Sequence, residues 1–164
     1  MKNYILIIII IPYLAVCAIS VYANSDVEIV MKGTLPYDKS ITIGDAFNNF
    51  RYFESKKWKA HQDENNRRLV TFIGALDLGK LKYYNNEFRK LQAAFIRVVF
   101  VITIDNSIDI RSFSYQILLP GEFKLLNWII DPDCLKDSVL NIYRNDSKSG
   151  LIISHELTEH LSGH

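Results

Sequence analysis

The sequence predicts an α+β fold in which helices pack on one face of an antiparallel sheet of about five strands. Segments with alternating apolar and polar residues, the pattern of a half-buried strand, outnumber those with helical spacing. Short polar turns join these segments in pairs, and such turns connect antiparallel rather than parallel strands. The expected order of elements is β-α-β-β-(α)-β-β-α, which gives one helix layer on one sheet.

The first expected elements are a strand, a turn and a helix. Residues 27–32 alternate apolar and charged side chains and predict a strand that ends at Gly33. Residues 36–40 predict a turn. Thr42 predicts a helix start, because its hydroxyl can accept a hydrogen bond from an amide of the first turn. The helix is expected to end near Phe53, and its apolar face consists of Ile43, Phe47 and Phe50.

Two hairpins are expected next. Residues 57–61 and 68–76 predict paired strands, joined by a turn of residues that tolerate positive φ. Residues 94–104 form the most regular alternating segment, and residues 107–117 return beside it. The alternation of the returning strand changes phase, so a bulge near Arg111 is expected. That bulge would put five apolar residues on one face: Ile108, Ile110, Phe113, Tyr115 and Ile117.

The remaining segments give weaker patterns. Residues 78–92 have helical spacing, with a mobile loop as the alternative, and the apolar residues 123–130 predict a helical turn. Asp131 followed by Pro132 predicts the start of a last helix, because proline fits the first helical position. This helix is expected to end near Tyr143, with an apolar face of Leu135, Val139 and Ile142.

The N-terminus predicts an export signal. One lysine precedes an uncharged apolar run at residues 4–22, and Ala23 followed by the polar Asn24 is typical of a signal-peptidase site. The run approaches the roughly 20 residues that span a membrane, so a retained anchor is an alternative. Cys17 provides another, because residues 14–17 resemble a bacterial lipobox, from which they depart at the residue before the cysteine.

These patterns predict a signal peptide at residues 1–23, one domain at residues 24–145 and a flexible tail at residues 146–164. The expected location is the periplasm or cell envelope, and membrane contact is expected only through the N-terminal segment. Without residues 1–23, 18 basic and 18 acidic side chains remain, because that segment contains one lysine and no acid. A neutral domain is not typical of nucleic-acid binding. Cys134 is then the single cysteine, and we expect it to be a small buried hydrophobe.

The C-terminal histidines are the only residues that hint at a metal site. His155 and His160 are five residues apart, whereas the zinc-protease motif needs four, so that motif is rejected. Glu156, His160 and His164 would share one face of a helical tail and could hold a metal ion weakly. A solvated tail is the preferred interpretation, and no cofactor is expected. A metal-dependent hydrolase that uses this cluster is the enzymatic alternative.

Four residues are candidates for a binding surface. Arg97 and Thr103 fall on the mixed side of the strand predicted at residues 94–104. Tyr52 and Trp58 lie at a helix-to-strand corner among lysines, a composition typical of interfaces. The alternative is that both aromatic residues cap the edges of the core. We therefore expect a non-enzymatic domain that binds a protein or envelope component, with a purely structural envelope lipoprotein as a further alternative.

Several short motifs resemble a family of small exported bacterial proteins of unknown function. They are Lys-Gly-Thr-Leu at 32–35, Thr-Ile-Gly-Asp-Ala-Phe at 42–47, Trp58 and Val-Thr-Phe-Ile-Gly at 70–74. The resemblance implies an exported domain and no catalytic residue. Within it, Gly44 is expected to let the first helical turn approach the sheet. The layout is also similar to small outer-membrane assembly lipoproteins, as an analogy of fold alone.

Overall fold

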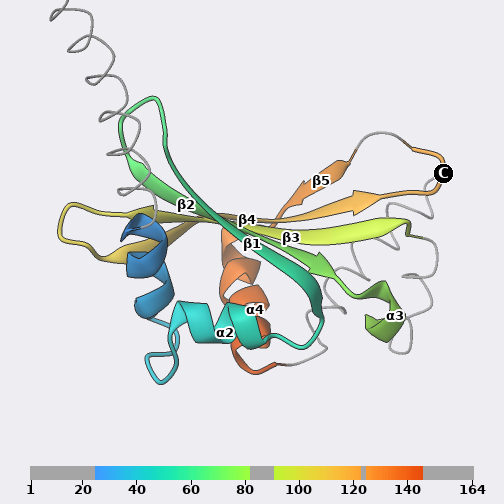
Figure 1. Ribbon diagram of the computed structural model, residues 1–164, viewed down its shortest axis with the longest axis horizontal. Coiled ribbons are helices and arrows are strands. Elements are labelled where there is room, and N and C mark those ends of the chain that lie inside the picture. The colour runs from blue at the N-terminus through green and yellow to red at the C-terminus, as the bar shows by residue number, and fades with distance from the viewer. Residues whose placement is uncertain (1–24, 82–90, 123–124, 146–164) are drawn as a thin grey trace, which may run out of the picture.

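The computed structural model describes residues 25–81, 91–122 and 125–145, and its centre is a five-stranded antiparallel sheet (Figure 1). The strands are β1 (Phe53–Gln62), β2 (Arg68–Leu76), β3 (Ala93–Ile102), β4 (Ile108–Leu118) and β5 (Leu126–Ile129). Their spatial order is β1-β2-β3-β4-β5, so each strand pairs with its neighbours in the sequence. The predicted α+β class and antiparallel sheet are confirmed.

Among the described residues, four helices accompany the sheet. Residues 25–32 are helical and are followed by α2 (Ile43–Asn49), α3 (Leu78–Leu81) and α4 (Pro132–Tyr143). Figure 1 shows α2 and α4 together on one side of the sheet and α3 beyond the end of β2. The order is α-α-β-β-α-β-β-β-α, so the predicted order is wrong at two places.

The first wrong element is the strand predicted at residues 27–32, which is a helix. Its apolar residues fit both periods, and Val30 is fully buried while Val27 packs beside it at helical spacing. The second is the helical turn predicted at residues 123–130, where β5 pairs with β4 from Leu126 to Ile129. Periodicity cannot distinguish a helix from a strand in apolar runs this short, so contacts with the rest of the chain decide between them.

The helix predicted to end near Phe53 is shorter, and the strand after it is longer. Phe50 has extended backbone angles (φ −63°, ψ 114°) and ends α2 after Asn49. β1 therefore begins at Phe53 instead of Lys57. Thr42 caps α2 as predicted, with its hydroxyl accepting from the Asp45 amide at 3.0 Å. Asp131 caps α4 in the same way, accepting from the Asp133 amide at 2.9 Å.

The two predicted hairpins are present, although the bounds of β1, β3 and β4 differ from those predicted. Asn66 adopts a positive φ of 56° in the turn after β1. In the β3–β4 pair, Val99 lies opposite Ser112 and Phe100 lies opposite Ile110, so Arg111 is the extra residue of a bulge. The phase change therefore leaves the apolar residues of β4 in one core, as predicted.

An aromatic cluster fills the space between α2, α4 and the sheet. Phe47 of α2 is its centre, with ring centroids 4.9 Å from Phe72, 5.7 Å from Phe100 and 6.0 Å from Trp58. Tyr143 of α4 closes the cluster at 6.4 Å. Edge-to-face contacts of this kind add to the stabilisation that comes from burial. These contacts place the core on the helix side of the sheet.

Gly44 has a different neighbour from the one that the sequence predicts. A Cβ built on Gly44 would lie 2.7 Å from the carbonyl oxygen of Met31 and 3.1 Å from its Cα. The glycine therefore permits close contact between α2 and the helix at residues 25–32, rather than between α2 and the sheet. This contact could not be predicted because the sequence assigns residues 27–32 to a strand.

Candidate binding surface

Strand alternation divides the side chains of the sheet between two faces. Trp58, Phe72 and Phe100 point toward the helices, as their contacts with Phe47 show. The residues between them therefore point to the opposite side, which we call the outer face. Its members in the three strands from β1 to β3 are Lys57, Lys59, His61, Leu69, Thr71, Ile73, Ala75, Phe95, Arg97, Val99 and Val101.

Three cations lie close together on the outer face. Lys57 pairs with Ile73, and Ile73 pairs with Arg97, so the two cations lie in one row with a single strand between them. Strand spacing puts their Cα atoms about 10 Å apart, and Lys59 follows Lys57 by about 7 Å along β1. The spacing within β1 is inside the Debye length of about 8 Å at physiological salt, whereas the spacing from Lys57 to Arg97 slightly exceeds it, so the two lysines reinforce each other more than either reinforces Arg97.

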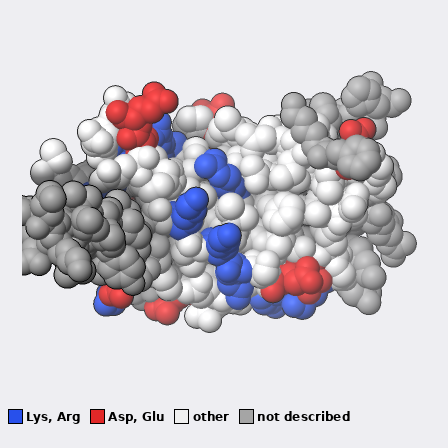
Figure 2. All heavy atoms as spheres, turned by 45° about the horizontal axis from the view of Figure 1, so that its top comes forward, with Lys and Arg blue, Asp and Glu red and all other residues white. Residues whose placement is uncertain are grey.

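No acidic side chain of the described residues forms an ion pair with Lys57, Lys59 or Arg97. Figure 2, which turns this side toward the reader, shows a band of Lys and Arg across the middle of the molecule and Asp and Glu toward its margins. The chain as a whole has a formal net charge of only +1. The positive character of this face thus comes from the placement of charge, and not from an excess of basic residues.

The four predicted binding residues do not form one surface. Arg97 lies half-buried on the outer face, in the middle of β3. Thr103 lies beyond the end of β3, in the turn to β4, where its hydroxyl contacts Asp105 and bonds to Ser107. Its assignment to the strand surface is therefore wrong, because the strand ends at Ile102 and the hydroxyl stabilises the turn.

Tyr52 and Trp58 belong to the core side. Tyr52 is 2% exposed, so its side chain is not available at the surface. Trp58 is half-buried, its ring lies 4.7 Å from that of Phe72, and its Nε1 donates to Asn48 Oδ1 at 3.1 Å. The alternative interpretation of these aromatics as caps of the core edge fits this geometry.

Cys134 was predicted to be a buried residue. It is instead exposed near the start of α4.

Lys57 and Lys59 are functional candidates that the sequence pattern alone did not separate from Trp58. Alternation places Trp58 on the opposite side of β1 from these two lysines. Lys56 shares the side of Trp58, and its Nζ donates to the carbonyl oxygen of Asn48 in α2 at 2.6 Å. Period-two alternation applied to β1 would have separated these residues.

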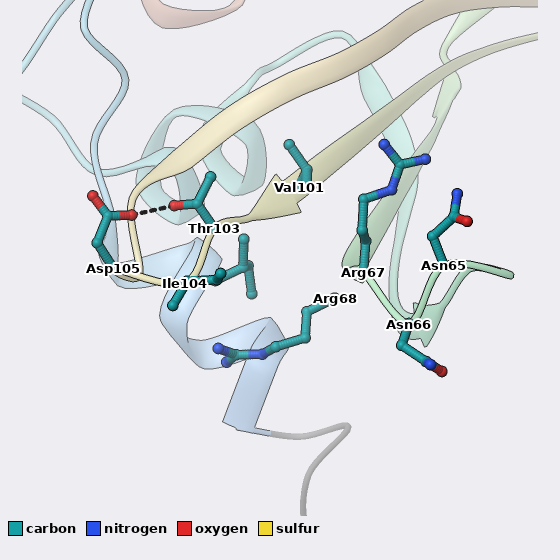
Figure 3. A pocket seen from close by; sticks show the side chains of 9 residues that line it. Asn65, Asn66, Arg67, Arg68, Val101, Thr103, Ile104 and Asp105 are labelled. Atoms are coloured by element: carbon teal, nitrogen blue, oxygen red, sulfur yellow. Dashed lines mark hydrogen bonds between the residues drawn. The ribbon is translucent and has the colours of Figure 1, made fainter.

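A pocket of about 750 Å³ lies at one end of the sheet, between the β1–β2 and β3–β4 turns. Figure 3 shows Asn65, Asn66 and Arg67 on one side, and Thr103, Ile104 and Asp105 on the other. Ile104 is fully exposed at the tip of its turn. The pocket wall is mainly apolar, so this site suits an apolar group better than an ion.

The arginines of this pocket are already paired. Arg67 Nε lies 2.7 Å from Asp63 Oδ2, and Arg68 Nη2 lies 2.5 Å from Asp26 Oδ1. Asp63 also accepts from Arg111 Nη1 at 2.8 Å. Partial desolvation raises the pKa of Asp63, but hydrogen bonds from Arg67 and Arg111 outweigh it and hold the pKa well below its ordinary value. These ion pairs therefore link the β1–β2 turn to β4, and β2 to the helix at residues 25–32.

Other shifted carboxylates have similarly local causes. The Thr103 hydroxyl lowers the pKa of Asp105, the Lys80 side chain lowers that of Asp77, and the Ser40 hydroxyl lowers that of Asp38. Burial raises the pKa of Tyr143 well above its ordinary value. Each of these carboxylates bonds within its own turn, so none of them forms an acid–base pair with another.

The remaining predicted sites lie outside the described residues. They are Cys17, Ala23, Asn24, Glu156, His160 and His164. Within residues 25–81, 91–122 and 125–145, no three His, Cys, Asp or Glu side chains gather where they could hold a metal ion. The helices of those residues are all too short or too polar to cross a membrane.

Comparison with protein-family models, curated proteins and solved structures finds no match to this chain.

Proposed function

We propose that this chain is an exported, non-enzymatic domain of the periplasm or cell envelope that binds an acidic protein surface through its outer face. The observation that supports this most directly is the group of Lys57, Lys59 and Arg97. These cations share one side of a sheet, and none has an ion-pair partner among the described residues. We infer here that the helices pack only on the face of the sheet opposite the outer face.

The composition around these cations favours a protein over a lipid or glycan partner. Ile73, Phe95 and Val101 are half-buried on the outer face, so apolar side chains surround the charges. Interfaces between proteins combine apolar patches with a few well-placed charges, and arginine is enriched in them. A simple polyanion would gain nothing from the apolar side chains.

The shifted pKa values support a structural role for the carboxylates involved. A catalytic acid usually has a raised pKa and lies beside a second functional group. Here Asp63, Asp77 and Asp105 have lowered pKa values because hydrogen bonds within turns stabilise their ionised forms. These groups hold the chain in place, and we assign no reaction to them.

Export is inferred from the N-terminal sequence. Mass spectrometry of the mature N-terminus tests it directly, and we expect a chain that begins at Asn24. An acylated Cys17 would instead indicate a lipoprotein, and an intact Met1 in membranes a retained anchor. Recovery of the intact chain from cytosol would contradict export.

The test of binding compares two charge reversals. Arg97→Glu changes the centre of the outer face, and Lys136→Glu makes the corresponding charge reversal at an exposed position of α4. We expect one protein from envelope extracts to bind the unchanged chain and Lys136→Glu, and to bind Arg97→Glu at least tenfold more weakly. The identified protein is then purified, and its affinity for all three chains is measured at two salt concentrations.

Three results would contradict the proposal. The first is equal affinity of the purified partner for Arg97→Glu and Lys136→Glu. The second is unfolding of Arg97→Glu in a thermal melt, which would assign Arg97 to stability. The third is a lipid or glycan as the component lost on Arg97→Glu, which would leave the outer face as the site but exclude a protein partner.

A further inference from the structure

β1 is one of the two edge strands of the sheet, and no other strand of the described residues covers its long outer edge. β1 pairs only with β2, although it is ten residues long and its side chains are mostly exposed. Exposed edges of this length can pair with another chain, so proteins usually protect them with charges, bulges or short strands. β1 has the lysines 56, 57 and 59 along this edge.

The hairpin turn determines which backbone groups of β1 face outward. The Asp63 amide donates to the Arg67 carbonyl at 3.2 Å, which makes this pair a hydrogen-bonded one. Hydrogen-bonded pairs alternate with non-bonded ones in an antiparallel ladder. The residues of β1 at 57, 59 and 61 therefore bond to β2. Those at 56, 58, 60 and 62 point their amides and carbonyls to the open edge, and no described residue bonds to them.

Charge decides between two occupants of this edge. In an antiparallel pair with β1 of a second copy, lysines would lie opposite or diagonal to lysines, and like charges in that position are destabilising. An acidic strand would meet the same lysines with opposite charge. Lys57 and Lys59 are available for this contact, because only Lys56 has a hydrogen bond within the described residues, to Asn48.

We propose that the free edge of β1 accepts an acidic, extended segment of the partner protein as a sixth, antiparallel strand. This inference rests on the proposed function and adds the mode of binding to it. The guest strand has Asp or Glu at every second residue, facing Lys57 and Lys59 on the outer face. Apolar residues between them face Trp58, which is half-buried on the other side.

The first experiment uses a defined probe with the full chain. The probe is the peptide acetyl-Ser-Glu-Val-Glu-Val-Glu-Ser-amide, and the matched control has Lys in place of each Glu. We expect the acidic peptide to bind at millimolar or lower concentration and the basic peptide to bind at least tenfold more weakly. The variant Lys57→Glu/Lys59→Glu should reverse this preference. Both positions are exposed, so the variant should keep its melting temperature.

Hydrogen exchange at single-residue resolution then shows where the peptide binds. The amides of Lys56, Trp58, Ala60 and Gln62 should exchange rapidly in the free chain and become at least tenfold slower with the acidic peptide. The amides of residues 57, 59 and 61 already bond to β2, so their exchange should change little. Binding to the outer face without strand addition would not produce this alternation.

Equal or absent binding of the two peptides at millimolar concentration would overturn the inference. Binding without alternating protection in β1 would overturn it as well. In both cases the proposed function stands if Arg97→Glu still weakens capture of the partner. If Arg97→Glu does not weaken capture but the β1 amides show alternating protection, strand addition is the binding mode. The outer face is then excluded as the binding surface.

Discussion

The two faces of this sheet are built from the same strands and differ sharply in what they contain. On the helix side, Phe72 is fully buried and contacts the rings of Phe47, Phe53 and Trp58. One residue further along the chain, Ile73 is half-buried between Lys57 and Arg97. The aromatic packing that stabilises the fold is therefore concentrated on one side.

This separation means that stability and recognition depend on different residues. At the half-buried positions of the outer face, such as Ile73, a side chain can change with a smaller loss of packing, whereas Leu69, Thr71 and Val99 of the same face are at most 7% exposed. A side chain on the helix side contacts several rings at once, so it has little freedom to change. Substitutions at adjacent positions of one strand should therefore have very different effects, and this can be measured.

The largest difference is expected between residues 72 and 73 of β2. Phe72→Ala removes a fully buried ring from the aromatic cluster and should lower the free energy of unfolding by about 3–5 kcal/mol. Ile73→Ala truncates a half-buried side chain and should cost about 1 kcal/mol. Urea denaturation of both variants measures the difference. Equal losses would show that the outer face is packed as tightly as the core.

A smaller effect is expected where two helices meet on the packed side. Gly44→Ala places a Cβ against the Met31 backbone at 2.7 Å, and a backbone carbonyl cannot rotate away as a side chain can. We expect a loss of about 1–3 kcal/mol from this overpacking. Gly79→Ala is the matched control, since its Cβ would meet only a carboxylate oxygen of Asp77 at 3.0 Å. An unchanged free energy of unfolding in Gly44→Ala would mean that the helix at residues 25–32 can shift to accommodate the added Cβ.

Patterns that combine several signals were predictive of the fold. β2 has the predicted bounds, and the phase change at Arg111 correctly predicted a bulge. Thr42 and Asp131 marked both capped helices, because a cap depends on a few neighbouring residues. Such local features need no information about distant parts of the chain.

The errors arose where tertiary contacts choose between two local possibilities. Residues 27–32 fit both a strand and a helix, and they lie in a helix at residues 25–32 that the part-buried Asp26–Arg68 ion pair joins to β2. Residues 126–129 form a strand only because β4 offers them an edge. The cation group was missed for a similar reason, because Arg97 is forty residues from Lys57 in the sequence and two strands away in the sheet.

The ion pairs of Asp63 in the β1–β2 turn predict how stability depends on pH. The pKa of Asp63 in the folded chain lies below its ordinary value of 3.8, so its hydrogen bonds stabilise the fold at neutral pH. That stabilisation is present above the ordinary pKa and is lost as the pH falls through the lower, folded value. Asp63→Asn should therefore lower the melting temperature at pH 7, and by less at pH 2. A constant difference between the two chains would show that Asp63 acts through the shape of the turn and not through its charge.

The smallest effect is expected at a buried hydroxyl of the outer face. Thr71 is 7% exposed, and its Oγ1 has no hydrogen-bond partner among the described residues. Valine has nearly the same shape, so Thr71→Val removes an unsatisfied polar atom and should stabilise the chain by up to about 1 kcal/mol. Ser138→Ala makes the corresponding change in α4, where the serine is fully buried. If both variants are more stable but only Thr71→Val binds the partner more weakly, then the outer face retains a polar atom for recognition at the expense of stability. If Thr71→Val is instead destabilised, its hydroxyl has a role in the fold, and the separation between the two faces does not hold at this position.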